Sequence, residues 1–210
     1  PSNPELLDYL AKEFVNSKFD SKAVIRMILN SRLYQVGSEP TDYNRNDRQN
    51  FARYYARRMP AEVFLDVVNQ VTGNKAGLNG ISANGRAIDL PHENFGSYFL
   101  DTFDRPRRVT ACECERSTGA TLAQVLLLSN SEEVEGKISS KEGRLTKLIQ
   151  SKKPMEELLD ELYLGAFSRF PTAAEKTRLM NFVAKVDDKQ QAYEDVLWAI
   201  VNSREFMFNH

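Results

Sequence analysis

The sequence predicts an all-α fold, a compact multi-helix domain interrupted by one long irregular insertion. Two observations carry this prediction. Apolar residues recur at helical spacing along most of the chain, and many of these runs are bounded by residues that start or end helices. Strand-like patterning is confined to a few residues near 109–113. We therefore expect helices packed on helices, with no sheet larger than a short two-stranded ribbon.

Four helices are predicted in the first third of the chain. The first covers about 4–17, the second runs from a cap at Asp20 or Ser21 to about 30–32, the third covers about 46–58, and the fourth runs from Pro60 to Gly73. Asn3 followed by Pro4 is typical of a helix start, since Asn caps N-termini and proline tolerates the first turn. In the helix expected over 46–58, Phe51, Tyr54 and Tyr55 would point inward. Gly73 would end the fourth helix, because glycine readily adopts the left-handed geometry of a C-cap.

Residues 73–117 differ from the rest of the chain because glycine and proline punctuate them repeatedly. An irregular stretch of this length is uncommon inside a compact domain and is often functional. Within it we expect one short helix near 97–102 and an extended piece near 109–113. We therefore expect a functional site, if the chain has one, in this segment.

Helices resume after residue 117. An apolar stretch over 122–128 predicts a buried helix, and further helices are expected after it, which gives roughly ten in the chain. Three residue pairs match the capping box of a helix start: Asn130 with Glu133, Ser139 with Glu142, and Thr172 with Glu175. Residues 1–210 would together form a single helical domain.

The charge balance excludes a generic polyanion binder. Lys and Arg number 28 against 29 Asp and Glu, whereas nucleic-acid-binding domains normally carry a basic excess. No apolar run approaches the roughly 20 residues that span a bilayer, so we expect no nucleic-acid partner and no direct membrane insertion. The chain begins at Pro1 with no leader, which indicates a C-terminal fragment of a larger protein.

One polar segment is not explained by helix periodicity. Its candidate binding residues are Arg105, Arg108, Cys112, Glu113, Cys114, Glu115 and Arg116. In extended backbone, alternate side chains share a face, so the two cysteines would lie on one face and the two glutamates on the other. We favour a structural interpretation, in which the glutamates pair with arginines and the cysteines are small buried side chains.

Three other roles for this segment are alternatives to the structural one. Thiolates and carboxylates ligate metals, but a zinc site needs about four ligands, and the chain has one Cys-x-Cys pair and two histidines. Glu113 and Glu115 could instead act as general acid and base on a glycan. The arginines could hold a sulfate or carboxylate of a polysaccharide. We expect no metal and no cofactor, and no catalytic residue is assigned.

Three parts of the sequence resemble a known family. They are residues 1–11 with 28–35, the stretch SYFLDTFDRP (97–106) with CECERS (112–117) and 121–124, and residues 197–210. Together they resemble the PSD domain of planctomycete surface and cytochrome-like proteins, a domain of unknown function. The middle part is the most specific. One departure is Asp104, where relatives often have glycine in the turn before Arg-Pro.

The resemblance implies an extracytoplasmic setting, in the periplasm or at the cell surface, within a large exported protein. It also implies an upstream helical partner domain. We expect as partner this upstream domain of the same polypeptide or an extracellular polysaccharide. It implies no established reaction.

The sequence therefore predicts a non-catalytic helical interaction module that binds a partner domain or an extracellular polymer. The alternative is a polysaccharide-acting hydrolase with its site around Glu113 and Glu115. The two differ in geometry, because an enzyme needs an exposed carboxylate in a concave pocket, whereas a module would bury both carboxylates in arginine pairs.

Overall fold

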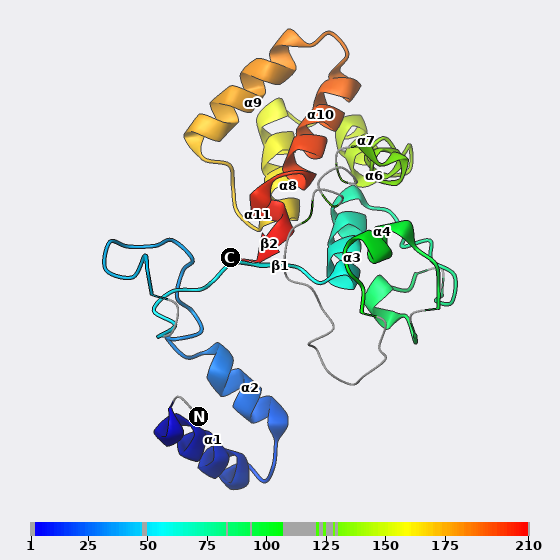
Figure 1. The fold of residues 1–210 in the computed structure, drawn as a ribbon. Coiled ribbons are helices and arrows are strands. Elements are labelled where there is room, and N and C mark those ends of the chain that lie inside the picture. Colours follow the sequence, from blue (N-terminus) through cyan, green and yellow to red (C-terminus); the bar gives the residue numbers. More distant parts are fainter. Residues whose placement is uncertain are drawn as a thin grey trace. The chain divides into compact units, whose positions relative to one another are not determined.

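The computed structural model describes residues 3–47, 50–82, 84–92, 94–106, 121, 124, 128 and 130–209. The described elements are helices apart from one two-stranded pairing, which confirms the all-α fold class (Figure 1). The chain divides into two compact units, unit 1 up to Ala56 and unit 2 from Arg57 to Asn209. That all 210 residues act as one domain stays a prediction. None of the described helices is long and apolar enough to cross a membrane.

Unit 1 begins with two helices that contact each other, α1 (Pro4–Asn16) and α2 (Ser21–Leu29) (Figure 1). Both helix starts are capped as predicted. Asn3 Oδ1 accepts a hydrogen bond from Leu6 N at 3.0 Å, and the Asp20 carboxylate caps α2 in the same way. Such a cap stabilises a helix by about 1 kcal/mol, because it satisfies backbone N–H groups that have no partner inside the helix.

The helix expected over 46–58 was a wrong prediction. The described residues of this stretch form turns, extended backbone and the strand β1 (Arg57–Arg58). Phe51 has a φ of +53°, a left-handed conformation that interrupts an α-helix. A contact with the preceding part of unit 1 holds the chain instead, since Tyr54 N donates a hydrogen bond to Gly37 O at 2.9 Å. Aromatic spacing alone did not reveal this tertiary contact.

In unit 2, helix α3 packs against several other elements, among them η1, α4, α6, α7 and α8 (Figure 1). Its described elements after β1 are α3 (Ala61–Thr72), the 3-10 helix η1 (Ala87–Asp89), α4 (Tyr98–Thr102), α6 (Glu132–Ile138), α7 (Arg144–Gln150), α8 (Met155–Phe167), α9 (Ala173–Lys185), α10 (Lys189–Val201), α11 (Arg204–Met207) and β2 (Phe208–Asn209).

Four phenylalanines form an aromatic cluster in the core of unit 2. The Phe64 ring of α3 lies 5.7 Å from Phe99, 5.0 Å from Phe103 and 5.8 Å from Phe206, measured between ring centroids. All four side chains are buried. Burying one such side chain contributes roughly 1.5–3 kcal/mol, so the cluster fastens α4 and α11 to α3.

The short strands β1 and β2 pair antiparallel, with Arg57 opposite Asn209 and Arg58 opposite Phe208. This pairing joins the first and the last residues of unit 2. It is no larger than the short two-stranded ribbon that the sequence predicts as the upper limit.

Two predictions around the irregular segment are confirmed. Helix α3 ends at Gly73, whose φ of +72° is left-handed. The short helix expected near 97–102 is α4, and Ser97 caps it, because its Oγ accepts a hydrogen bond from Leu100 N at 3.2 Å.

Of the three predicted capping boxes, the one at Thr172 forms. Its Oγ1 accepts a hydrogen bond from Glu175 N at 3.3 Å, and the Glu175 carboxylate accepts one from Thr172 N at 2.7 Å. Helix α6 begins instead after Ser131, whose hydroxyl accepts from Glu133 N. Ser139, predicted to start a helix, follows the last residue of α6.

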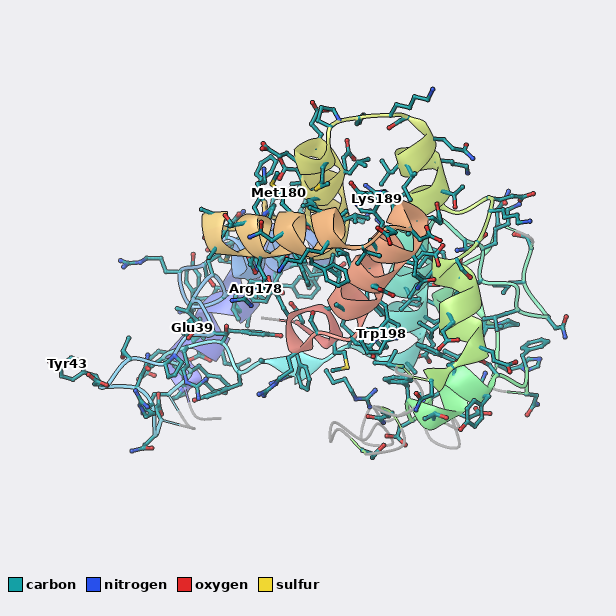
Figure 2. The ribbon with its side chains drawn as sticks, turned by 90° about the horizontal axis from the view of Figure 1, so that it is seen from above. Glu39, Tyr43, Arg178, Met180, Lys189 and Trp198 are labelled. Carbon is teal, nitrogen blue, oxygen red and sulfur yellow. The ribbon has the colours of Figure 1, made fainter. Side chains whose placement is uncertain are left out.

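The C-terminus of α9 is capped by a lysine at the start of α10 (Figure 2). Lys189 Nζ donates hydrogen bonds to Val183 O and Val186 O, both at 2.7 Å. The last carbonyls of a helix lack partners inside it and carry partial negative charge, which a lysine ammonium compensates. This cap ties α9 and α10 together at their junction.

Candidate functional site

Of the seven candidate binding residues, the structure describes Arg105. The others lie outside the described residues: Arg108, Cys112, Glu113, Cys114, Glu115 and Arg116. The extended piece expected near 109–113 also falls there. The predicted pairing of the glutamates with arginines therefore stays a prediction.

Arg105 is held inside unit 2, with 7% of its side chain exposed. Its Nη1 donates a hydrogen bond to Phe95 O at 2.8 Å, and its Nη2 donates to Asp101 Oδ1 at 2.7 Å. The guanidinium thus fastens the end of α4 to the chain that precedes it. Two of its donors are engaged in structural contacts rather than turned toward solvent.

Gln124 lies on the other side of residues 107–120 and is also buried, with 2% exposed. Its Nε2 donates hydrogen bonds to Thr102 O and to Asp104 Oδ2, both at 3.1 Å. Residues that precede and follow the predicted segment therefore meet at the C-terminal end of α4.

Arg58 completes this junction from β1. Its Nη1 donates a hydrogen bond to Phe103 O at 3.0 Å, and its Nη2 lies 3.7 Å from Asp104 Oδ2. Asp104 has a φ of +59°, the left-handed conformation that glycine adopts most easily. Asp104 therefore adopts this backbone geometry without being glycine, and it contributes a carboxylate that two neighbours contact.

A cavity of about 500 Å³ lies between α3 and the chain that follows it, and we call it the α3 cavity. Its polar lining residues are Asp66, Asn69, Gln70, Asn74, Lys75, Asn84 and Arg86, and its apolar ones include Val63, Val67, Ala76 and Ile88. The Asp66 carboxylate accepts hydrogen bonds from Ala87 N and Ile88 N, which holds η1 against α3. The wall of the cavity is thus fixed by hydrogen bonds.

Asn69 is the exceptional residue of the α3 cavity. It is 5% exposed, and neither its Oδ1 nor its Nδ2 has a hydrogen-bond partner among the described residues. Buried amides nearly always have partners, and an unmet one costs about 1–3 kcal/mol. The sequence pattern did not single out this residue, although Asn69 and Gln70 do interrupt the apolar run from Val67 to Val71.

The rim of the α3 cavity carries an ion pair. Arg86 Nη2 lies 3.3 Å from Asp89 Oδ1, and both side chains are largely exposed. The hydrogen bond between them raises the pKa of Arg86 and lowers the pKa of Asp89. The charge of Arg86 is therefore already matched, whereas no described carboxylate pairs with the exposed Lys75.

A second cavity, of about 500 Å³, lies between α6 and α10. Glu135, Glu194 and Asp195 line it together with Trp198 of α10 (Figure 2). Two of the carboxylates accept hydrogen bonds from glutamine amides one turn earlier in α10. The cavity is therefore acidic, with one partly exposed aromatic ring beside the carboxylates.

In unit 1, the apolar side chains of α1 and α2 are largely exposed, and no residue of either helix is buried. The contact between the helices leaves Leu10, Phe14, Val24 and Met27 half-buried. The exposed set is Leu6, Leu7, Tyr9, Val15, Ile25, Ile28 and Leu29. We call this set the α1–α2 apolar surface.

Across the described part of the chain, no group of three or more His, Cys, Asp and Glu residues could hold a metal ion. This finding does not extend to the Cys-Glu-Cys-Glu stretch, which lies outside the described residues.

A comparison with protein-family models matches residues 1–183 to PSD1, described as a protein of unknown function (DUF1553). The chain belongs to the PSD1 family. This confirms the resemblance read from the sequence. Comparisons with curated proteins and with solved structures gave no match.

The PSD1 match takes in unit 1, the α3 cavity and the chain as far as α9. Helices α10 and α11 lie beyond it, yet Val196, Leu197 and Phe206 from these helices are buried in the core of unit 2. The core of unit 2 is therefore completed by residues outside the PSD1 match.

Proposed function

We propose that this PSD1 chain is a non-catalytic interaction module of a large exported protein, and that the α1–α2 apolar surface docks onto an upstream domain of the same polypeptide. The exposed apolar side chains of α1 and α2 carry the proposal. Contiguous exposed apolar surface is rare on monomeric proteins and marks sites of association.

The face of α2 that turns away from α1 supports this role. Ile25 and Leu29 are one helical turn apart and are 54% and 43% exposed. Ala23, Val24 and Met27 on the other face are half-buried. Helix α2 is thus apolar on two faces while α1 covers one, so its second face suits an apolar groove in a partner.

The test measures binding between this chain and the separately produced upstream domain by isothermal titration calorimetry. The double variant Ile25→Glu with Leu29→Glu should weaken binding at least ~100-fold, since both anchors would carry a charge into the interface. Lys12→Glu, an exposed change elsewhere in unit 1, is the matched control and should bind as the parent chain does.

Two outcomes contradict the proposal. One is an upstream domain that does not bind, or that binds the double variant as well as the parent chain. The other is glycan hydrolysis by the chain that disappears in Glu113→Gln or Glu115→Gln, which would establish the polysaccharide hydrolase in place of the non-catalytic module.

A further inference from the structure

We propose that Asn79 is a site of spontaneous covalent modification, at which the side-chain amide is lost and an isoaspartate linkage forms. Asn79 precedes Gly80, and both residues are exposed in a turn between α3 and η1. The reactants are this chain and water. The site belongs to unit 2, so the modification and the docking role of unit 1 are independent of each other.

The reaction begins at the backbone nitrogen of Gly80. Once deprotonated, this nitrogen attacks Cγ of Asn79. An N–Cγ bond forms, the Cγ–Nδ2 bond breaks, and Nδ2 leaves as ammonia with the proton that the Gly80 nitrogen lost. Water then opens the cyclic imide. Its attack at Cγ cleaves the new bond and gives aspartate, whereas its attack at the main-chain carbonyl carbon of Asn79 cleaves the original peptide bond and gives isoaspartate.

Both reacting groups are available in the folded chain. Among the described residues, the Asn79 carboxamide forms no hydrogen bond and the Gly80 N–H donates none. The attack needs a nitrogen that can lose its proton and a carboxamide that can turn toward it. Glycine also leaves the nitrogen unhindered, because it has no side chain. The exposed turn therefore presents the Asn-Gly pair in a form that can react.

The chain contains a second Asn-Gly pair, Asn84–Gly85, and the fold protects this one. Gly85 N donates a hydrogen bond to Ser82 O at 2.8 Å. This bond must break before the nitrogen can lose its proton and attack. We therefore expect Asn84 to react about tenfold more slowly than Asn79, although both asparagines precede a glycine.

The packing of Phe95 requires the glycine that makes Asn79 reactive. Gly80 has a φ of +90°, and a Cβ at this position would overlap the Phe95 ring. Glycine is the residue that meets both conditions without strain. Gly80 cannot be replaced without disturbing Phe95, so the reactive pair is tied to the local fold.

An isoaspartate next to Gly80 should displace Phe95, because the main chain would gain a methylene carbon directly before the glycine. The Phe95 ring also stacks on His92, with ring centroids 4.5 Å apart. The carbonyl oxygen of Phe95 accepts a hydrogen bond from Arg105 Nη1 at 2.8 Å. The modification would therefore act beyond the exposed turn, on the contacts of the buried Arg105.

The first test incubates the full chain in mildly alkaline buffer and follows each asparagine by peptide mapping with mass spectrometry. Asn79 should deamidate about tenfold faster than Asn84 in the folded chain. In urea the two rates should become equal, because the Gly85 N–H is then free. A methyltransferase specific for isoaspartate should label the peptide that contains Asn79.

Three results of this test would overturn the assignment. They are a reaction at Asn84 as fast as that at Asn79 in the folded chain, a tenfold ratio that persists in urea, and an Asn79 peptide that gains no isoaspartate. In the first two results the hydrogen bond of Gly85 would not control the rate.

The second test uses His92 to report the displacement of Phe95. The sequence has two histidines and the other is the terminal His210, so the imidazole signals of His92 can be assigned by NMR. These signals should shift in the incubated parent chain in proportion to its isoaspartate content, since the stacked ring moves away. Unshifted signals in a chain that carries isoaspartate would contradict the displacement.

Variants at the two pairs are the controls for this shift. Asn79→Gln closes the cyclic imide far more slowly, because its side chain is longer, and should be incubated without a shift of the His92 signals. Freshly purified Asn79→Asp carries the new charge without the added carbon and should give the spectrum of the fresh parent chain. Asn84→Gln should behave as the parent chain does. A shift of equal size in incubated Asn79→Gln would overturn the assignment.

Discussion

Asp104 shows how one side chain can hold a left-handed backbone and a polar junction together. Its φ is +59°, and its Oδ2 lies 3.1 Å from Gln124 Nε2 and 3.7 Å from Arg58 Nη2. Asp and Asn tolerate this conformation better than other non-glycine residues. Asp104 therefore joins residues on both sides of the candidate segment, at a backbone position that few side chains fit.

Asp104→Val should destabilise unit 2 by about 2–4 kcal/mol, because a β-branched side chain is strained at this φ and the hydrogen bond from Gln124 is lost. Asn also tolerates the left-handed conformation and keeps an acceptor oxygen, so Asp104→Asn should lower the free energy of unfolding by about 1 kcal/mol or less. Urea denaturation of both variants measures the difference. Equal stabilities would show that the left-handed geometry is unimportant here.

Arg169, in the loop after α8, joins α9 and α11 through its guanidinium. It forms hydrogen bonds with Glu205 at 2.6 and 2.8 Å and with Glu175 at 2.9 and 3.0 Å. The hydrogen bond from Arg169 lowers the pKa of Glu175 to about 2, helped by Thr172, while desolvation opposes the shift. The same pairing raises the pKa of Arg169.

Because the pKa of Glu175 is lower in the folded chain than its ordinary 4.5, its contribution to stability is present above pH 4.5. It should be lost progressively as the pH falls from 4.5 to about 2. Glu175→Gln should remove this part of the acid dependence and cost roughly 1–2 kcal/mol at pH 7. Melting temperatures from pH 2 to 7 measure this, with the exposed Glu157→Gln as control. If the melting temperature of Glu175→Gln falls with decreasing pH as steeply as that of the parent chain, Glu175 is not the source of this acid dependence.

At the scale of elements, the end of α3 depends on a glycine. Gly73 has a φ of +72°, and a Cβ at this position would lie 2.7 Å from Arg144 N and 2.8 Å from Arg144 Cβ. Both the left-handed backbone and the close approach of α7 therefore require glycine.

Gly73→Ala should destabilise the chain by about 2–4 kcal/mol, from backbone strain and the clash with α7. Gly136→Ala is the contrasting change, since Gly136 lies inside α6 with open space around its Cα. It should stabilise the chain by about 0.5–1 kcal/mol through helix propensity. Thermal denaturation compares the two. If Gly73→Ala melts like the parent chain, the close packing of α3 against α7 is not maintained in solution.

The sequence predicted helices well where local signals set them. Asn3, Asp20 and Thr172 cap the helices expected from them, and Gly73 ends α3, because a cap is a contact within a few residues. The helix expected over 46–58 failed because its aromatic spacing is local, whereas Tyr54 bonds to Gly37, far outside any capping window.

The candidate site was predicted less well, for a physical reason. Arg105 was recognised as unusual, but its burial against Phe95 and Asp101 depends on tertiary contacts. Asn69 was not recognised, because amides commonly lie at the border between the apolar and polar faces of a helix, and Asn69 looks like one of these in the sequence. Only the missing hydrogen-bond partner in the folded chain distinguishes it.

At the scale of the whole molecule, the two units differ in how much they bury. Helices α1 and α2 contain no buried residue, whereas α3 and α10 contribute many buried residues to the core of unit 2. Amide protons exchange through local opening, and a helix with little buried apolar surface opens at low free-energy cost.

We therefore expect amides of α1 and α2 to exchange at least ~100-fold faster than those of α3 and α10, measured by hydrogen–deuterium exchange on this chain alone. If an upstream domain docks on this surface as proposed, its addition should slow exchange in α1 and α2 while leaving α3 unchanged. Equal protection of α1 and α3 in the chain alone would contradict this expectation, because the α1–α2 apolar surface would then be covered already.

The pairing of β1 with β2 has a consequence for the connectivity of unit 2. Because Arg57 lies opposite Asn209, the two ends of unit 2 can be linked covalently by a short peptide without moving any helix. New termini could then open at the exposed turn around Lys152, between α7 and α8. Unit 2 is thus suited to circular permutation, and to insertion within a loop of a host protein whose two loop ends lie close together.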